Sequence, residues 1–288
     1  MAGHRKDMLD IQRIIQLKAR GESNRSIARL LAINYRKLFY DAFVAPINHI
    51  LMKISHLLLT FCFLISLQTT LAQEKSPYVF KKPSANGTGK VYMGREIAHV
   101  MSFEGVEWLE RNSRTQEENT TLALASLPLK NNSIVADIGA GSGFYTFRVA
   151  KRIPKGKVYA VEIQDDAIAY LKKKATDDRL DNVEVIRGTE KSPNLPDSSI
   201  DLAFMVDVYH ELQHPAAYLA ALKKALKPNG QLLLLEYKEE DPTVAIKPEH
   251  KMSVRQAKKE LAANGFKLVK NGRFLPLQHF LLFEKTDK

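Results

Sequence analysis

A glycine-rich turn between two acidic residues is the stretch of this sequence best suited to hold a ligand. Residues 135–163, VADIGAGSGFYTFRVAKRIPKGKVYAVEI, predict a strand that includes Asp137, a turn through 139–143 and a helix directly after it. Glycines permit a tight turn and let a ligand approach the backbone closely. The helix N-terminus offers free N–H groups to an anionic group such as a carboxylate. Glu162 ends the next strand, 23 residues after Gly139, where a carboxylate can accept hydrogen bonds from both hydroxyls of a ribose.

The spacing of these glycines separates two kinds of nucleotide site. A nicotinamide dinucleotide site uses the pattern GxGxxG, in which the second glycine admits the pyrophosphate. This chain has GxGxG, and Phe144 occupies the place of the third glycine of the dinucleotide pattern. A bulky residue at that place argues against close approach of a pyrophosphate.

Apolar runs alternate with helical stretches from Ile134 onward, which predicts a parallel sheet covered by helices on both faces. The chain ends differently, because the strands expected at 266–269 and 279–284 are joined by a loop too short for a crossover helix. Such strands pair antiparallel. The other predicted strands are 134–138, 158–163, 183–186, 200–206 and 231–236, and the predicted helices include 165–175, 215–226 and 253–264.

Over roughly residues 92–285 these features resemble the class I S-adenosylmethionine-dependent methyltransferases. The stretches GTEKSPNLPDSSIDLAFMVDVYHEL (188–212) and ALKKALKPNGQLLLLEY (221–237) are similar to the family's segments around the adenine loop and the fourth and fifth strands. The small-molecule methyltransferases similar to those of quinone biosynthesis look most alike. The resemblance implies an α/β fold: a Rossmann-like, doubly wound, seven-stranded sheet, mostly parallel with a C-terminal antiparallel strand pair, and an N-terminal helical cap. It also implies S-adenosyl-L-methionine as cofactor and methyl transfer by in-line displacement at the sulfonium methyl.

The resemblance further implies which residues hold the cofactor. The glycines of the turn take its methionine moiety, Asp137 orients the turn and the amino group, Glu162 binds the ribose and Ile163 packs against the adenine. Many relatives have Gly-Asp where this chain has Gly188-Thr189, so the usual acidic contact to adenine is missing; Glu190 or the backbone of Thr189 are the substitutes. The implied cofactor-binding residues are Asp137, Gly139, Ala140, Gly141, Gly143, Glu162, Ile163, Gly188, Thr189 and Asp207.

The segment DVYHEL, 207–212, is the expected place for a catalytic residue, because ligands of open α/β sheets bind at the carboxyl ends of the strands. The cofactor carries the reactive methyl group, so a dedicated catalytic residue is not required. The candidates are His210, whose side-chain type can accept a proton near neutral pH, and Tyr209, as a wall of the substrate site. The alternative for His210 is a histidine at a helix start, bonded to backbone. No metal site is expected.

Residues 92–129 predict two helices that form the cap. In this family such a segment covers the cofactor and contributes to the substrate pocket. The alternative is a packed cap in which the arginines pair on its surface with Glu107, Glu110 or Glu118. The candidate substrate contacts are Tyr92, Arg95, Trp108, Arg111 and Arg114.

The class of acceptor is narrowed by motifs that this chain lacks. Methyltransferases of DNA amino groups carry [DNS]-P-P-[YFW] after the fourth strand, where this chain has Asp207-Val208-Tyr209-His210. Enzymes that methylate C5 of a base need a Pro-Cys nucleophile, and the single cysteine is Cys62. A small molecule or a protein side chain remains as the acceptor, and no nucleic acid partner is expected for the main domain. The small molecule is favoured, because the sequence shows no extra recognition domain. A non-catalytic S-adenosylmethionine-binding protein and a DNA-binding, mobile-element-derived protein are the alternatives.

Residues 52–72 have the layout of an export signal, with Lys53, an apolar stretch at 57–67 and small residues before Gln73. The segment predicts a signal peptide, hence an exported, periplasmic protein, or an anchored one that contacts the membrane only through 52–72 if it stays uncleaved. A cytoplasmic location is the alternative if the N-terminal arm masks the signal.

The arm, residues 1–51, carries +5 of the net charge of +11, so the main domain has an ordinary charge balance. Its first 35 residues or so resemble the opening helices of a transposase helix-turn-helix from an insertion sequence, with a turn at Gly21. The expected continuation is absent, and the hypothesis is a non-functional fused fragment. Residues 73–91 predict a disordered lead-in, and residues 130–288 the methyltransferase domain.

Overall fold

A computed structural model describes residues 12–30, 52 and 76–286 of the chain, in two units that divide between Lys75 and Ser76. In the first unit residues 12–19 are helical, Gly21 turns the chain with φ +80°, and α2 spans Asn24–Leu30. This is the pair of helices expected around Gly21; the likeness to a transposase stays a prediction. The expected export segment, 52–72, lies outside the described residues except for Met52. Within the described part of the chain, no helix is long and apolar enough to cross a membrane.

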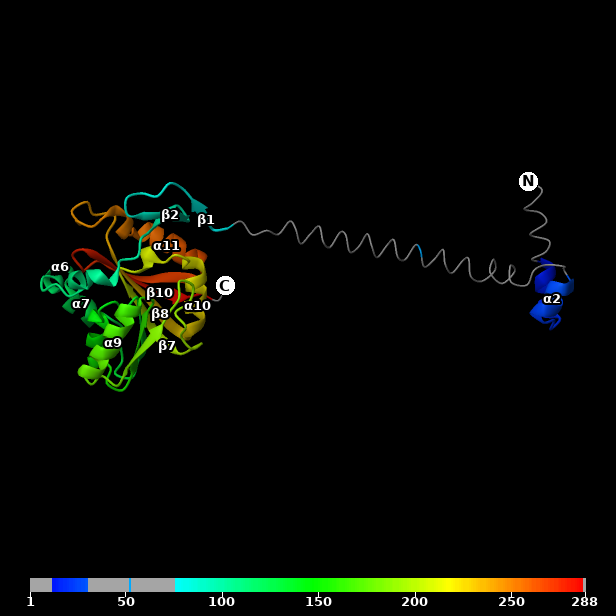
Figure 1. The fold of residues 1–288 in the computed structure, drawn as a ribbon, viewed down its shortest axis with the longest axis horizontal. Coiled ribbons are helices and arrows are strands. Elements are labelled where there is room, and N and C mark those ends of the chain that lie inside the picture. Colours follow the sequence, from blue (N-terminus) through cyan, green and yellow to red (C-terminus); the bar gives the residue numbers. More distant parts are fainter. Residues whose placement is uncertain (1–11, 31–51, 53–75, 287–288) are drawn as a thin grey trace. The chain divides into compact units, whose positions relative to one another are not determined.

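The second unit is built on a seven-stranded sheet in the order β6-β5-β4-β7-β8-β10-β9. Figure 1 labels three neighbouring strands of this sheet, β7, β8 and β10. The pairs from β6 to β8 are parallel, and β10 pairs antiparallel with both β8 and β9. The prediction of a mostly parallel, doubly wound sheet that ends in an antiparallel pair is confirmed. The strands are β4 (Ile134–Ile138), β5 (Lys157–Glu162), β6 (Val183–Arg187), β7 (Ile200–Val206), β8 (Leu226–Tyr237), β9 (Phe266–Gly272) and β10 (Gln278–Lys285).

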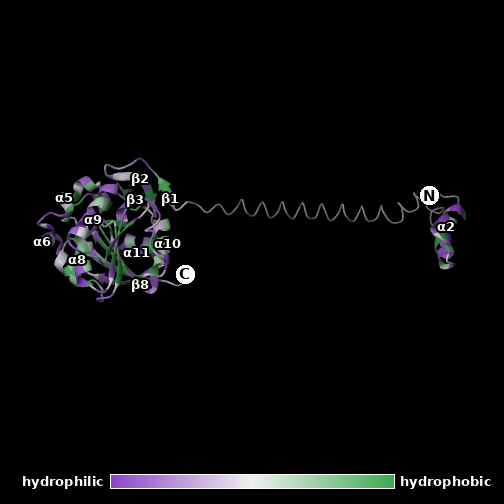
Figure 2. Cartoon of the chain, turned by 60° about the horizontal axis from the view of Figure 1, so that its bottom comes forward, coloured by the Kyte–Doolittle hydropathy of each residue, from purple (hydrophilic) through white to green (hydrophobic). Residues whose placement is uncertain are grey.

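Two apolar layers lie on opposite faces of this sheet, because successive side chains of a strand point to opposite sides. Val135 of β4 packs with α7 and α8, whereas its neighbour Ala136 packs with α10 and α11. Figure 2 shows hydrophobic strands at the centre of this unit and hydrophilic residues on the outer sides of the helices. The α-helices are α5 (Val106–Leu109), α6 (Arg114–Glu118), α7 (Thr120–Ala125), α8 (Phe144–Arg152), α9 (Asp165–Asp177), α10 (Pro215–Ala225) and α11 (Val254–Ala263).

A small antiparallel sheet, in the order β1-β2-β3, precedes the large one and corrects two expectations. Its strands are β1 (Tyr78–Phe80), β2 (Gly87–Tyr92) and β3 (Arg95–Ala98), where the sequence predicts a disordered lead-in and the start of a helix. Met93 and Gly94 join β2 to β3 with φ values of 51° and 99°, as in a type I′ hairpin turn. Glu96 fixes the sheet: it pairs with Lys81 at 2.7 Å and accepts the Gly89 N–H.

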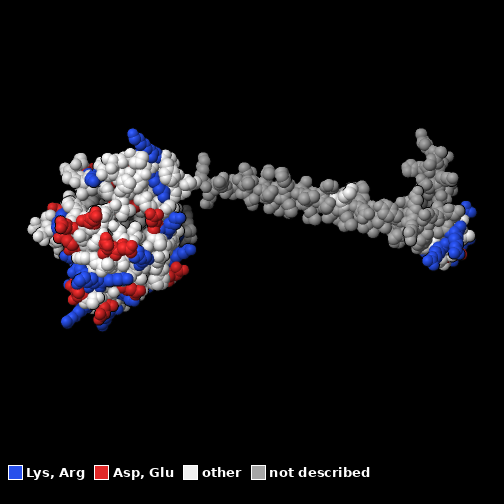
Figure 3. All heavy atoms as spheres, in the orientation of Figure 1, with Lys and Arg blue, Asp and Glu red and all other residues white. Residues whose placement is uncertain are grey.

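The order of strands places a topological switch between β4 and β7, since β4, β5 and β6 run outward on one side and β7 and β8 on the other. Ligands of such sheets bind beside the carboxyl ends of the strands at this point. Lys, Arg, Asp and Glu side chains are interspersed on the face of the unit that Figure 3 shows. This mixed surface agrees with the small net charge of the main domain.

Candidate active site

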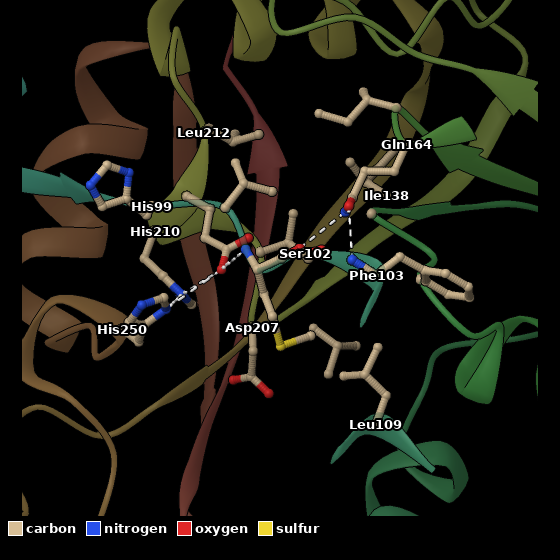
Figure 4. A pocket seen from close by; sticks show the side chains of 18 of the residues that line it. His99, Ser102, Phe103, Leu109, Ile138, Gln164, Asp207, His210, Leu212 and His250 are labelled. Atoms are coloured by element: carbon tan, nitrogen blue, oxygen red, sulfur yellow. Dashed lines mark hydrogen bonds and ion pairs between the residues drawn. The ribbon is translucent and has the colours of Figure 1, made fainter. Parts of the chain in front are cut away.

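A pocket of about 640 Å³ lies at the carboxyl ends of β4, β5, β7 and β8. This volume suits a cofactor-sized ligand, since ligand pockets range from about 300 to 1,000 Å³. The predicted residues that line it are Trp108, Arg114, Gly139, Gly141, Glu162, Ile163, Thr189, Asp207 and His210. The strand ends therefore bring together residues that lie up to a hundred positions apart in the sequence (Figure 4).

The glycine turn between β4 and α8 has a backbone that other residues adopt with difficulty. Gly139, Gly141 and Gly143 have φ values of +69°, +54° and +74°. A Cβ at Gly139 would lie 2.7 Å from a methyl of Val208, and one at Gly143 would lie 2.2 Å from the ring of Phe147. The first two glycines line the pocket, whereas Gly143 packs beneath the turn and gives α8 its start.

The carboxylate of Glu162, at the end of β5, ties this turn to the next strand. Its Oε2 accepts the N–H of Gly141 at 2.9 Å, and its Oε1 accepts the N–H groups of Ile163 and Gln164 at 2.6 and 3.1 Å. Oε2 keeps one further lone pair, and the side chain lines the pocket. Glu162 can therefore hold the turn in shape and still accept a hydrogen bond from a ligand.

Asp207 follows β7 and carries an acceptor that nothing in the described residues satisfies. Its Oδ2 accepts from Gln278 Nε2 at 2.7 Å, but its buried Oδ1 has no partner among the described residues. Burial, with the charges of Glu118 and Glu236, raises the pKa of Asp207 well above its usual range, against the opposing charge of Arg114. An ammonium group in the pocket would supply both the missing donor and a positive charge. The predicted cofactor has such a group on its methionine moiety, so the site fits it.

Asp137, on β4, lies beneath the turn and not in the pocket wall. It accepts from Thr146 Oγ1 at 2.6 Å, and burial raises its pKa to about 7. A small adjoining cavity of about 30 Å³ reaches Asp137 and Ala140 and shares Gly139 with the main pocket. Asp137 is thus placed to position the turn through α8, whereas its expected role with the amino group of the cofactor stays a prediction.

The predicted adenine end lies beside Ile163, which is 39% exposed and lines the pocket. Thr189 and Glu190 line the same wall, so both predicted substitutes for the missing acidic contact are in place. Gly188 lies behind them, where its N–H donates to the carbonyl of Glu162 at 2.9 Å.

The segment before α5 covers the pocket and is fixed by one side chain. Gln164 accepts the N–H of Phe103 at 2.9 Å and donates to the carbonyl of Met101 at 3.0 Å (Figure 4). Because Gln164 follows Glu162 and Ile163, the strand that is predicted to bind the ribose also holds the cover. Trp108 lines the pocket and is 46% exposed.

Three of the five candidate substrate contacts lie away from the pocket wall. Tyr92 is buried, with its hydroxyl accepting from Asn264 Nδ2 at 2.7 Å. Arg95 forms a buried ion pair with Glu260 at 2.8 Å. Arg111 stacks on Trp108, with 3.8 Å from its guanidinium carbon to the ring centroid, and pairs with Glu117 and Glu118.

Arg114 lines the pocket but is paired as well, with Glu118 at 3.0 Å. The alternative expectation, a packed cap of paired arginines, is therefore the one that describes Arg111 and Arg114. It differs in one respect: Glu118 is fully buried and does not lie on the surface.

The two neighbouring candidates in DVYHEL point in different directions. Tyr209 is fully buried, its hydroxyl donates to Glu260 at 2.9 Å, and burial raises its pKa well above the usual value. It does not line the pocket, so the expectation of a catalytic or wall-forming tyrosine is wrong. His210 lines the pocket, and its Nδ1 is 2.6 Å from the buried carboxylate of Glu236. The backbone-bonded histidine considered as its alternative is therefore not what the structure shows.

A second histidine and a carboxylate adjoin His210, at a site where the sequence leads us to expect no metal. His250 and Glu211 each have a ligand atom within 4.8 Å of His210, and all three line the pocket. Glu211 is part of DVYHEL, but no motif around Glu236 or His250 indicates a role for either. Only the pairing of β7 with β8 and the loop after β8 bring them to the site.

Comparisons with known proteins agree with this geometry. The sequence model of a methyltransferase domain matches residues 129–273. A crystal structure of an S-adenosylmethionine-dependent methyltransferase from Aquifex aeolicus is 28% identical, with a TM-score of 0.59 over 64% of this chain and 98% of that one.

Two curated relatives match parts of the chain. An uncharacterised methyltransferase of Schizosaccharomyces pombe is 30% identical over 129 residues, which is 43% of this chain and 46% of the relative. A ubiquinone/menaquinone biosynthesis C-methyltransferase of Bordetella avium is 32% identical over 104 residues, 36% of this chain and 40% of the relative. The chain thus spans less than half the length of these two curated relatives.

Proposed function

The chain belongs to the family of S-adenosylmethionine-dependent methyltransferases, and we propose that it methylates a small-molecule acceptor bound beside His210. The observation that carries the proposal is a single pocket with two different ends. One end has the glycine turn, Glu162 and Asp207; the other has His210, and the cap segment is bonded beside both, to Gln164 and to Glu211. When bound, the cofactor supplies an electrophilic sulfonium methyl carbon, so the protein has only to align an acceptor with it.

Glu162 and Asp207 are the residues we assign to cofactor binding. The remaining lone pair of Glu162 Oε2 accepts a ribose hydroxyl, and the unpartnered Oδ1 of Asp207 accepts from the ammonium group of the methionine moiety. Ile163 offers an apolar surface to the adenine. The Gly139 and Gly141 positions let the ligand approach the backbone, since no side chain stands there.

His210 is the residue we assign to the acceptor. Glu236 Oε2 is paired with Nδ1 of His210 and so fixes the ring. Nε2 is the ring nitrogen on the side away from Glu236. Apolar residues of the cap, such as Met101 and Trp108, line the same pocket and suit an acceptor with an apolar part.

The test uses cofactor labelled on its methyl group and two fractions of an extract from cells that naturally make the protein. We expect label to appear in the low-molecular-mass fraction, and to be lost with Asp207→Asn. Transfer into the protein or nucleic acid fraction instead would refute the small-molecule acceptor. Calorimetric binding of S-adenosylmethionine without any transfer would favour the non-catalytic binding protein, and no binding at all would refute the proposed site.

A further inference from the structure

Two histidines and one carboxylate converge at the acceptor end of the pocket. The distance between His210 Nε2 and His250 Nδ1 is 3.1 Å. Glu211 Oε1 lies 3.5 Å from His250 Nδ1 and 3.8 Å from His210 Nε2. Figure 4 shows the two rings turned toward each other from η3 (Tyr209–Glu211) and η4 (Pro248–His250).

These separations suit ligands of one cation better than a set of hydrogen bonds. Three atoms bound to one tetrahedral zinc ion at about 2.0–2.1 Å lie about 3.3–3.4 Å from one another. The three measured edges scatter around that value. The 3.8 Å between Glu211 Oε1 and His210 Nε2 is too long for a hydrogen bond. The carboxylate therefore lies near the ring of His210 without being hydrogen-bonded to it.

We propose that His210, Glu211 and His250 bind a divalent cation of the zinc type at the acceptor end of the pocket. Two histidines and one carboxylate form a set that holds such ions in proteins, and their open positions accept water or substrate. The role of this cation in methyl transfer rests on the proposed function, because that function places the methyl acceptor beside His210.

The surroundings of each ligand are already ordered for this task. A metal-bound histidine commonly donates its other ring N–H to a carboxylate, which fixes the ring and leaves the second nitrogen free to ligate. Glu236, fully buried, stands 2.6 Å from His210 Nδ1 in that way. Glu211 Oε1 also accepts the N–H of Met101 at 3.2 Å.

His250 is held through its neighbour in the chain. Glu249 accepts from Ser84 Oγ at 2.6 Å, which ties η4 to the segment between β1 and β2. Two carboxylates, Glu211 and Glu236, adjoin the two rings, and a divalent cation would offset their negative charge.

The cation determines the class of acceptor. All three ligands line the pocket, so a coordination position opens into it. An acceptor hydroxyl or thiol would coordinate there and release its proton to solvent, since coordination lowers its pKa. The lone pair of the resulting anion forms the new bond to the methyl carbon as the bond from that carbon to sulfur breaks, and the bonding pair remains on sulfur as a neutral thioether.

The experiment is a titration of the full chain, stripped with a chelator, with Co²⁺ followed by visible absorption and displacement by Zn²⁺. We expect saturation at about one ion per chain. His250→Ala and Glu211→Gln should weaken Co²⁺ binding at least about 100-fold, because loss of even an outer partner of a metal ligand costs about 10- to 100-fold. These two sites are preferred to His210, whose removal leaves Glu236 buried without its partner.

His279→Gln is the matched control, since His279 pairs with Glu240 at 2.8 Å and does not line the pocket. It should bind Co²⁺ as the unchanged chain does. The proposal would be overturned if the unchanged chain showed no saturable Co²⁺ binding, or if His250→Ala and Glu211→Gln bound Co²⁺ as tightly as the unchanged chain. The two histidines would then be a hydrogen-bonded pair. Calorimetry with S-adenosylmethionine on the same samples tests the proposed function separately. A lack of S-adenosylmethionine binding would contradict the proposed function and would leave the metal result unchanged.

Discussion

Replacement of Glu162 by glutamine tests the cofactor end of the pocket with a change of one atom. Oε1 of Glu162 accepts two N–H groups, so the oxygen of a glutamine must stay on that side. Its NH₂ then faces the N–H of Gly141, which in the unchanged chain donates to Oε2 at 2.9 Å. A hydrogen bond becomes a contact between two donors, and one acceptor for the ribose is lost.

The size of the effect follows from these bonds. A hydrogen bond to a charged group contributes about 1.5–3 kcal/mol. Loss of one such bond to the ribose should weaken S-adenosylmethionine binding about 10- to 150-fold, since each 1.4 kcal/mol or so is a factor of about ten. The domain should lose about 2–4 kcal/mol of unfolding free energy, because the Gly141 N–H also loses its acceptor.

Calorimetric titration with S-adenosylmethionine and urea unfolding measure the two effects on one preparation. Glu184→Gln is the control: it makes the same chemical change on β6, at an exposed carboxylate that pairs with Lys157 at 2.9 Å. It should leave binding unchanged and unfolding within about 0.5 kcal/mol, as surface pairs contribute little. A folded Glu162→Gln protein that binds the cofactor within twofold of the unchanged chain would refute the assignment of Glu162.

Two further predictions concern the buried residues under the turn. Burial raises the pKa of Asp137 from 3.8 to about 7, so the folded chain binds a proton more tightly than the unfolded one and stability falls as pH rises between these values, by up to about 4 kcal/mol. Asp137→Asn removes this loss. The unfolding free energy of the variant, measured in urea, should therefore rise relative to that of the unchanged chain between about pH 4.5 and about pH 7.5. A difference between the two proteins that does not change with pH would contradict the assigned pKa. Gly143→Ala should cost about 2–5 kcal/mol, from its φ of +74° and a Cβ 2.2 Å from Phe147. Gly94→Ala, with φ +99° and only Lys259 Nζ nearby at 3.8 Å, should cost about 1–2 kcal/mol, and equal losses would show that packing adds nothing at Gly143.

The sequence predicts the large sheet well because its signals are local. Buried parallel strands are continuous apolar runs, and β4, β5 and β7 are each followed by a helix, so the bounds of β4 to β7 agree with expectation within one residue. The glycine turn and Glu162 follow from the same order, since a loop and the next strand end meet at the edge of a parallel sheet. Glu162 also shows what sequence leaves out. The three N–H groups that its carboxylate accepts mean that Glu162→Ala disturbs the turn itself and not cofactor binding alone.

The small sheet was not predicted, because its strands are short and its residues are those of loops. Lys, Ser, Pro and Gly make up most of 81–90, and the useful signal, Met93-Gly94 between Tyr92 and Arg95, is only two residues long. The opposite directions of Tyr209 and His210 are likewise set by distant partners. Glu260 on α11 holds the tyrosine and Glu236 on β8 holds the histidine.

Most of the pocket, including the glycine turn, Glu162, His210 and His250, lies within residues 129–273, the part that matches the family, whereas the cap segment lies before it. What the relatives methylate therefore does not carry over to this chain, because part of the acceptor wall lies outside the shared region.

A short series of hydrogen bonds joins the two ends of the pocket, from Glu162 to Glu211. Glu162 accepts the N–H of Gln164, Gln164 donates to the carbonyl of Met101, and the N–H of Met101 donates to Glu211. A cofactor that orders Glu162 thereby orders the cap, and the cap orders a ligand of the proposed cation. Binding at one end of the pocket is expected to strengthen binding at the other, since two ligands that favour the same arrangement of the protein raise each other's affinity equally.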